Sequence, residues 1–172
     1  MNLESIKPIV FAISLLTLLV LCWVNFTTLA GKPTPFEFSF TQIFFVLFPV
    51  WAFTIHYLNE TTPKISDESI ASMNVLQKIR RLFGNPPDWA LVLTAGFYLY
   101  ALYSLFLFMT GGIVEPQYFN GQYQVNNHGK ITVYTEAEYQ MQHHLHIRSV
   151  TGFFMAFFSV STLVLAPWRK RS

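Results

Sequence analysis

Three histidines in the second half of the chain have spacings that suit a metal ion. His143 and His146 are three residues apart, so on a helix they would lie on one face and their imidazoles can share one ion. His128 lies in a predicted turn that can fold over this pair. This pattern predicts a metal site of His128, His143 and His146, and with it one candidate function, a metal- or cofactor-binding redox protein. The alternative is that these histidines are polar residues at a membrane boundary.

Two carboxylates precede the histidines, and paired carboxylates can act as general acid and base. Glu136 and Glu138 are two residues apart, about 200° around a helix, so they would not face each other. Roles in capping a helix and in complementing its dipole account for both. A membrane enzyme acting on a lipid or a glycan is therefore a second alternative. The sequence favours a protein that is not an enzyme and has no cofactor apart from a metal at the histidines.

Aromatic residues of the type that protein interfaces prefer surround these polar groups. They are Tyr118, Phe119, Tyr123, Tyr134 and Tyr139. They make protein–protein interaction the leading hypothesis, with another membrane or periplasmic protein as the partner. Two roles fit, an accessory subunit of a larger complex or an immunity-type protein. In size and in number of spans the chain resembles the immunity proteins of pore-forming bacteriocins, although it shares no motif with them.

The elements that must position these residues follow from composition. The chain has 172 residues, of which 52% are hydrophobic and only 12% are charged, whereas a soluble domain carries about 25% charged residues. Crossing a membrane takes about 20 apolar residues in a helix, and four uncharged runs reach that length. We expect a single all-α membrane domain over residues 1–172, an antiparallel bundle whose spans lie at about 8–31, 38–58, 89–112 and 149–168.

Basic residues predict the orientation of these spans, because lysine and arginine gather on the cytoplasmic side. Of the 11 lysines and arginines, eight fall on the side of the two termini and three on the other. We therefore expect a multi-pass inner-membrane protein with both termini in the cytoplasm. The basic residues lie where this topology needs them, so nucleic acid is not an expected partner and membrane lipids are.

Between the second and third spans the sequence predicts an amphipathic helix over about 67–83. Ser66 is a candidate N-cap and Gly84 a candidate left-handed cap at the other end. Apolar residues recur every three or four positions. The helix should lie on the inner membrane surface, with Lys78, Arg80 and Arg81 toward anionic lipid.

The segment at about 117–148 is predicted to lie outside the membrane and to hold a β-hairpin followed by a helical stalk. The sequence predicts strands at 122–125 and 131–134, joined by a five-residue turn at 126–130. Thr135 and Glu138 then form a capping box. No proline or glycine follows before Gly152, so one long helix should run from Glu136 to Pro167 and include the fourth span.

Within the four runs there is no Asp, Glu, Lys or Arg, which argues against a self-sufficient pump or transporter. Gly152 and Ala156 are spaced for close helix packing. The third span carries Tyr98, Tyr100 and Tyr103. Tyr100 and Tyr103 lie near one face, so we expect their hydroxyls to bond across a helix interface; the alternative is a pocket for a quinone or a lipid.

Overall fold

A computed structural model describes residues 3–32, 40–62, 73–110, 117–119 and 121–168. Its four long helices are α1 (Leu3–Leu29), α2 (Phe40–Thr61), α5 (Asp88–Met109) and α6 (Glu136–Leu165). All four are long and apolar enough to cross a membrane, which indicates a multi-pass membrane protein. The predicted spans are confirmed at this level. Helix α6 begins at the capping box, as expected, and ends at Leu165, just before the predicted end at Pro167.

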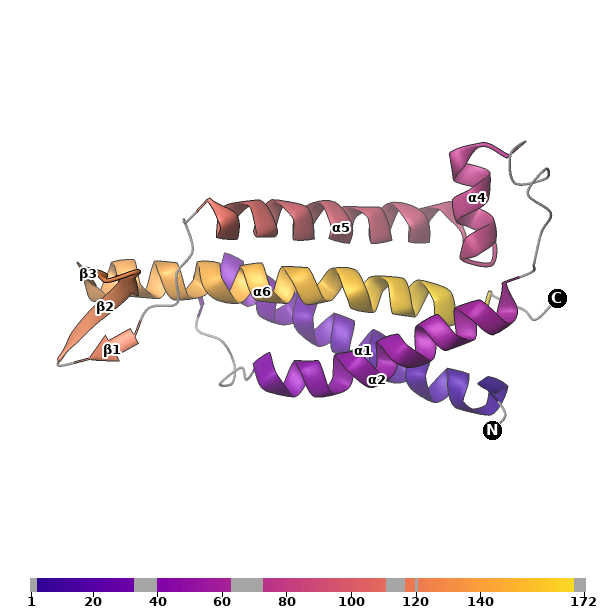
Figure 1. Ribbon diagram of the computed structural model, residues 1–172, viewed down its shortest axis with the longest axis horizontal. Helices are drawn as coiled ribbons and strands as arrows, with labels where there is room; N and C mark the ends of the chain where they lie inside the picture. The colour runs from indigo at the N-terminus through magenta and orange to yellow at the C-terminus, as the bar shows by residue number, and fades with distance from the viewer. Residues whose placement is uncertain (1–2, 33–39, 63–72, 111–116, 120, 169–172) are drawn as a thin grey trace.

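The long helices are arranged around α6. Helices α1, α2 and α5 each contact α6, with α5 on one side of it and α1 and α2 on the other (Figure 1). In its most apolar stretch 67% of α6 is buried, against 28% in α1 and α2 and 17% in α5. This arrangement differs from a bundle of four equivalent helices, because α6 fills the central position.

The core lies where α1, α2 and α6 meet. It is formed by Leu18 and Leu21 of α1, by Ile43, Leu47 and Val50 of α2, and by Phe154, Met155 and Phe158 of α6. At the end of α2, Tyr57 is fully buried against Val160 and Val164. Its hydroxyl donates a hydrogen bond of 3.3 Å to Glu4 Oε1 near the start of α1.

A short helix, α4 (Val75–Leu82), crosses the beginning of α5. The sequence predicts one helix over about 67–83, and within the described residues the structure differs from it at Met73 and Asn74, which are not helical. The chain enters α4 only after Asn74, whose side chain caps the helix reciprocally with Gln77. Ser66 and the first turn expected after it lie outside the described residues. The other end agrees with prediction, because Gly84 adopts a φ of 76°.

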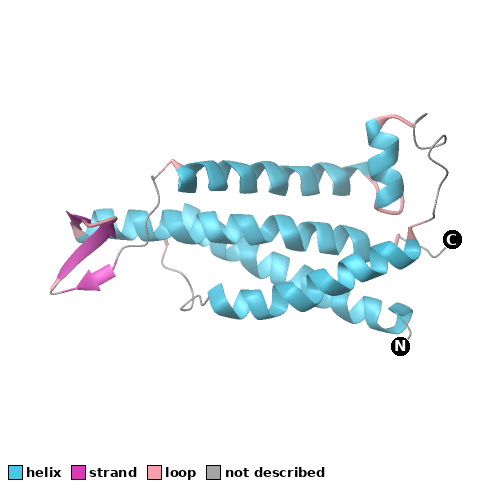
Figure 2. Cartoon of the chain, in the orientation of Figure 1, coloured by secondary structure: helices cyan, strands magenta, loops and turns pink. Residues whose placement is uncertain are grey.

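Strands occur at one end of the helices, and α4, the beginning of α1 and the end of α6 lie at the other (Figure 2). The strands are β1 (Gln117–Phe119), β2 (Gln122–Asn127) and β3 (Lys130–Tyr134). They form one antiparallel sheet in the order β1-β2-β3. Both β2 and β3 contact the beginning of α6. The sheet and the stalk, residues 136–148 of α6, therefore form one unit beyond the apolar stretches.

Candidate functional site

The stalk begins with the capping box that the sequence predicts. Thr135 Oγ1 accepts a hydrogen bond of 3.4 Å from the backbone N–H of Glu138, and Glu138 Oε2 accepts one of 2.9 Å from the backbone N–H of Thr135. Thr135 thereby adopts an extended conformation and turns the chain from β3 directly into α6. The last strand and the stalk are consequently joined without a loop.

The turn between β2 and β3 is tighter than predicted. Asn127 pairs with Lys130, so the connection has two residues, His128 and Gly129, and not five. Both adopt positive φ, of 52° and 91°, which the right-handed twist of a two-residue hairpin favours. Asn126 Oδ1 accepts a hydrogen bond of 2.8 Å from the Gly129 N–H. With His128 and Gly129 as the only turn residues, strand pairing extends to Asn127 and Lys130, beyond the strands that the sequence predicts.

A third strand, β1, was not predicted. Phe119 pairs with Gln122, so the connection between β1 and β2 also has two residues. Their sequence is Asn-Gly, which is the strongest short-range signal for a hairpin, and Gly121 has a φ of 80°. That dipeptide is the signal that could have revealed β1, whose three residues are too few for alternation to be read.

Aromatic rings connect the sheet to the stalk in a continuous row, which we call the aromatic row. The ring centroids of Tyr118 and Tyr123 are 5.0 Å apart, those of Tyr123 and Tyr139 are 4.2 Å apart, and those of Tyr139 and His143 are 6.0 Å apart. The first two residues lie on neighbouring strands and the last two are one turn apart on α6. This row packs the sheet against the stalk, and packing against a helix stabilises a small sheet.

The pairing of the strands divides the sheet into two faces. Val125 is 3% exposed, and together with Tyr123 it lies on the face toward the stalk, because alternate residues share a face. The opposite face, which we call the outward face, carries Phe119, Ile131 and Val133, whose pairing partners are Gln122, Asn126 and Gln124. These three apolar side chains are 58%, 59% and 56% exposed.

The five aromatic residues predicted to contact a partner are thus not equivalent. Tyr123, Tyr134 and Tyr139 are half-buried, and two of them belong to the aromatic row. Tyr118 is 63% exposed, but its ring contacts that of Tyr123 at a tilt of 58°, and only Phe119 lies on the outward face. Sequence reasoning missed Ile131 and Val133. Their alternation in β3 is visible in the sequence, but which face of the strand meets the stalk is not.

Electrostatic surroundings distinguish Tyr123 within the row. Partial burial raises the pKa of its phenol above the ordinary value, and the negative charge of Glu136 and the neighbouring phenols of Tyr118 and Tyr139 raise it further. Glu136, the first residue of α6, therefore raises the pKa of Tyr123 on β2. Glu138 instead accepts the capping hydrogen bond from the Thr135 N–H. The capping role of Glu138 agrees with the sequence, whereas the effect of Glu136 on Tyr123 was not predicted.

The three histidines lie in different surroundings. His128 is an exposed turn residue, His143 stacks on Tyr139 with an interplanar angle of 3°, and His146 is half-buried one turn nearer the apolar part of α6. Among the described residues, no group of three or more His, Cys, Asp or Glu side chains is arranged to hold a metal ion. Metal binding by His128, His143 and His146 stays a prediction from the sequence.

A polar network inside the helices was not anticipated. Asn25 of α1 donates hydrogen bonds to the carbonyl oxygen of Arg148 (3.1 Å) and to Thr151 Oγ1 (2.9 Å), and it accepts one of 2.9 Å from the hydroxyl of Tyr100. One side chain thus joins α1, α5 and α6. The predicted role of Tyr100 in bonding across a helix interface is confirmed. The sequence signal for Asn25 was an amide in an apolar run, which a search for charged residues alone overlooks.

At the other end of the helices, α4 presents basic and apolar groups together. Arg80 forms an ion pair with Asp88 at the start of α5. The large apolar side chains Val75, Leu76 and Leu82 are exposed, so the described part of the chain does not cover this side of the helix. Such a surface suits a helix that lies on a membrane, with Lys78 and Arg81 near the headgroups.

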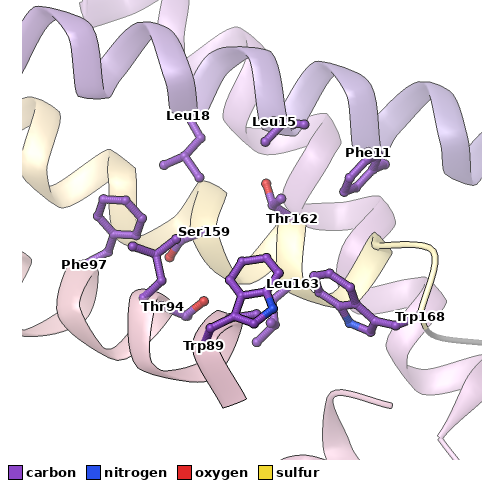
Figure 3. A pocket seen from close by; sticks show the side chains of 12 residues that line it. Phe11, Leu15, Leu18, Trp89, Thr94, Phe97, Ser159, Thr162, Leu163 and Trp168 are labelled. Carbon is purple, nitrogen blue, oxygen red and sulfur yellow. The ribbon is translucent and has the colours of Figure 1, made fainter. Parts of the chain in front are cut away.

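Near that end a groove of about 230 Å³ opens between α1 and α5 over α6 (Figure 3). Trp89 and Trp168 lie at one end of it, with their rings 6.0 Å apart in a T-shaped arrangement. Two hydroxyls in its wall have protein partners: Ser159 donates to the Ala156 carbonyl oxygen at 2.7 Å, and Thr162 is 3.0 Å from Ser14 Oγ. The lining is otherwise mostly apolar.

Comparisons with models of known protein families, with curated proteins and with solved structures find no match to this chain.

Proposed function

We propose that this chain is a multi-pass inner-membrane protein, with both termini in the cytoplasm, that acts by binding another membrane or periplasmic protein. The binding surface is the outward face of the sheet. Two biological roles are compatible with such a surface, an accessory subunit of a larger membrane complex and an immunity-type protein that holds a toxin.

The single observation that carries the proposal is the exposure of Phe119, Ile131 and Val133 on one side of the sheet. The other side of an antiparallel sheet that packs on a core is normally polar. Here the outward face pairs each of the three with an amide side chain and contains no charged residue among the described positions. Ile131 and Val133 on β3 and Phe119 on β1 thus flank a row of amide side chains on β2. An uncharged face with exposed apolar side chains, when it faces water, favours contact with another protein.

The placement of this face in water is supported by the distribution of charge. Eight of the 11 lysines and arginines belong to the side of the termini and α4, and the sheet lies at the opposite end of the helices (Figure 1). The exposed apolar side of α4 suits the inner membrane surface. The sheet would then be in the periplasm.

The aromatic row supports a binding role in a second way. Tyr123 and Tyr139 hold the sheet at a fixed position on α6, and α6 is the most buried helix. A surface that is ordered before binding loses less conformational entropy on association. A partner that meets the outward face therefore meets an ordered sheet.

Purification from native membranes in mild detergent tests the proposal. The wild type is compared with an Ile131→Asn/Val133→Asn variant, and with Thr132→Asn as the matched control on the opposite face of the same strand. We expect one partner in a fixed ratio with the wild type and with the control, and its loss from the double variant. Recovery of the same partner with all three proteins would contradict a role for the outward face.

Topology is tested separately with single cysteines in a Cys22→Ser background. A cysteine at Lys130 should react with a membrane-impermeant maleimide in cells whose outer membrane is permeabilised, and one at Gln77 should react only after lysis. The reverse pattern would contradict the orientation.

A further inference from the structure

We propose that a second groove, between α2 and α5 over α6, binds one acyl chain of a membrane phospholipid and hydrogen-bonds its ester carbonyl. This groove, which we call the sheet-end groove, has a volume of about 220 Å³. Its walls include Phe44 of α2, Leu105 of α5 and Phe153 of α6. The inference rests on the membrane placement in the proposed function and does not depend on the partner of the sheet.

Two serine hydroxyls distinguish this groove from an ordinary apolar surface. Ser104 of α5 and Ser149 of α6 both line it and are 3% and 8% exposed. No hydrogen bond joins either hydroxyl to another described residue, and both oxygens keep some accessible surface, since neither is among the fully buried polar atoms without a partner. Other hydroxyls in the helices do have partners. Thr54 and Thr151, for example, donate to carbonyl oxygens one turn earlier at 2.7 Å.

When the open side of the groove faces lipid, these hydroxyls are removed from water by the membrane, and a hydroxyl without a partner there destabilises the protein. Two such hydroxyls in one groove favour a bound molecule that supplies an acceptor. The rest of the lining is apolar: Phe44 packs edge-to-face on Phe154, with centroids 5.0 Å apart. The groove therefore suits a molecule that is apolar along most of its length and carries a hydrogen-bond acceptor at one point.

Depth identifies that acceptor. Ser149 is the first residue of the fourth apolar run and follows Arg148 directly, so it lies where the hydrocarbon region begins. Ser104 lies at a matching level, because its Oγ is 3.0 Å from the position that a Cβ on Gly152 would take, less than one turn from Ser149. The ester carbonyls of a bilayer lie at this boundary, with the acyl chains directed inward.

Size and access favour a chain over a ring-headed cofactor. Sites that enclose a drug-sized ligand have volumes of about 300–1,000 Å³, whereas this groove has about 220 Å³. Phe44, Leu105 and Phe153 are each between 41% and 43% exposed, so the groove is open on the side that would face lipid. A single chain can enter from that side without any movement of the helices.

The test uses the full-length protein in vesicles of phosphatidylethanolamine and phosphatidylglycerol that contain a photoreactive phospholipid. One probe has ester-linked chains and the other has ether-linked chains, which lack the carbonyl. After irradiation, labelled peptides are quantified. We expect the ester probe to label Leu105 and Phe153 roughly threefold to tenfold more than the ether probe, as one or two net hydrogen bonds predict, and a Ser104→Ala/Ser149→Ala variant to abolish the difference.

Ser159→Ala is the matched control, because its hydroxyl already bonds within α6 and faces the other groove. It should retain the preference for the ester probe. Equal labelling by the two probes in the wild type would overturn the inference, as would displacement of the ester probe from the groove by an isoprenoid quinone. If the chain did not cross the membrane, neither probe would label Leu99 and Phe106, two exposed residues of α5 outside the groove. Failure of the proposed function and failure of this inference are therefore distinguishable.

Discussion

The rings of Tyr123 and Tyr139 lie 4.2 Å apart at an angle of 32°, and they join a strand of the sheet to the helix that forms the centre of the molecule. Both side chains are half-buried in this contact. A small sheet gains stability by packing against a helix, and β2 and β3 both contact α6. The position of the outward face relative to the membrane therefore depends on this pair more than on any other contact between rings.

Replacement of Tyr139 by alanine should release the sheet from the stalk. The variant loses ring contacts to both Tyr123 and His143, so amide hydrogens in β2 and β3 should exchange about tenfold faster. Hydrogen exchange read by mass spectrometry measures this change. Tyr103→Ala, at an exposed position of α5, is the control and should leave the sheet unchanged. Unaltered exchange in the Tyr139 variant would show that the row does not hold the sheet.

Alkaline pH should loosen the same contact. Because the pKa of Tyr123 is raised in the folded protein, mainly by partial burial and then by Glu136, its neutral form is favoured there. The corresponding stability is fully present below the ordinary phenol pKa of about 10 and is lost as the pH rises through the raised value. The difference in phenolate absorbance between the wild type and Tyr123→Phe measures this titration.

A Glu136→Gln variant should lower the midpoint of that titration toward the ordinary value, and Glu60→Gln, at the far end of α2, should not. A midpoint for Tyr123 at or below that of free tyrosine would contradict the assignment.

The hydrogen bonds of Asn25 should stabilise the helices measurably. Each interhelical hydrogen bond in a membrane protein contributes about 0.6 kcal/mol on average, and Asn25 makes three. Asn25→Leu should therefore lower the free energy of unfolding in detergent by about 2 kcal/mol. Tyr100→Phe removes only one bond and should cost less. In the Asn25→Leu background, Tyr100→Phe should not lower the free energy of unfolding further, since the two residues share that bond.

The control for this cycle is Thr17→Val, whose hydroxyl bonds only within α1. Strict additivity of the Asn25 and Tyr100 effects would argue against their contact.

Two glycines should respond in opposite ways to alanine. A Cβ at Gly152 would lie 2.7 Å from Tyr100 Cε1, and the hydroxyl of Tyr100 is held by Asn25. Gly152→Ala should therefore push α5 away from α6 and cost about 1–3 kcal/mol. At Gly96 nothing lies within 4 Å of the added carbon, so Gly96→Ala should be neutral or stabilising by up to about 1 kcal/mol.

Thermal unfolding of the two variants in one detergent compares them directly, and Tyr100→Leu should suppress the Gly152→Ala defect. An equal effect of alanine at both glycines would contradict the close approach of α5 to α6.

Local signals in the sequence predicted the elements well. The length of each apolar run predicted the four long helices, and Thr135 with Glu138 predicted the start of α6 to the residue. Both signals act over neighbouring positions, because a run of apolar residues in lipid must satisfy its own backbone and a cap bonds the next turn. Alternation of residue types predicted the pairing of β2 with β3. The signal for β1 is the Asn-Gly dipeptide that follows it, because three residues are too few to show alternation.

Packing between distant segments was not predictable in the same way. All four helices are apolar around most of their surface, so periodicity does not reveal which side of α6 meets α1 or α5. Asn25 and Gly152 mark these contacts, but their partners are about 75 or more and about 50 residues away in the chain, respectively. For the same reason the sequence showed five aromatic candidates for a binding surface but not which face of the sheet was already occupied by the stalk.

Site-specific photo-crosslinking in living cells tests the central claim most directly. A photoreactive amino acid is placed at Val133, on the outward face, or at Thr132, its neighbour on the face toward the stalk. The account predicts one saturable adduct with another membrane or periplasmic protein from position 133, lost when Ile131 is also changed to Asn, and no such adduct from position 132. The same adducts from both positions, or none from position 133, would contradict it.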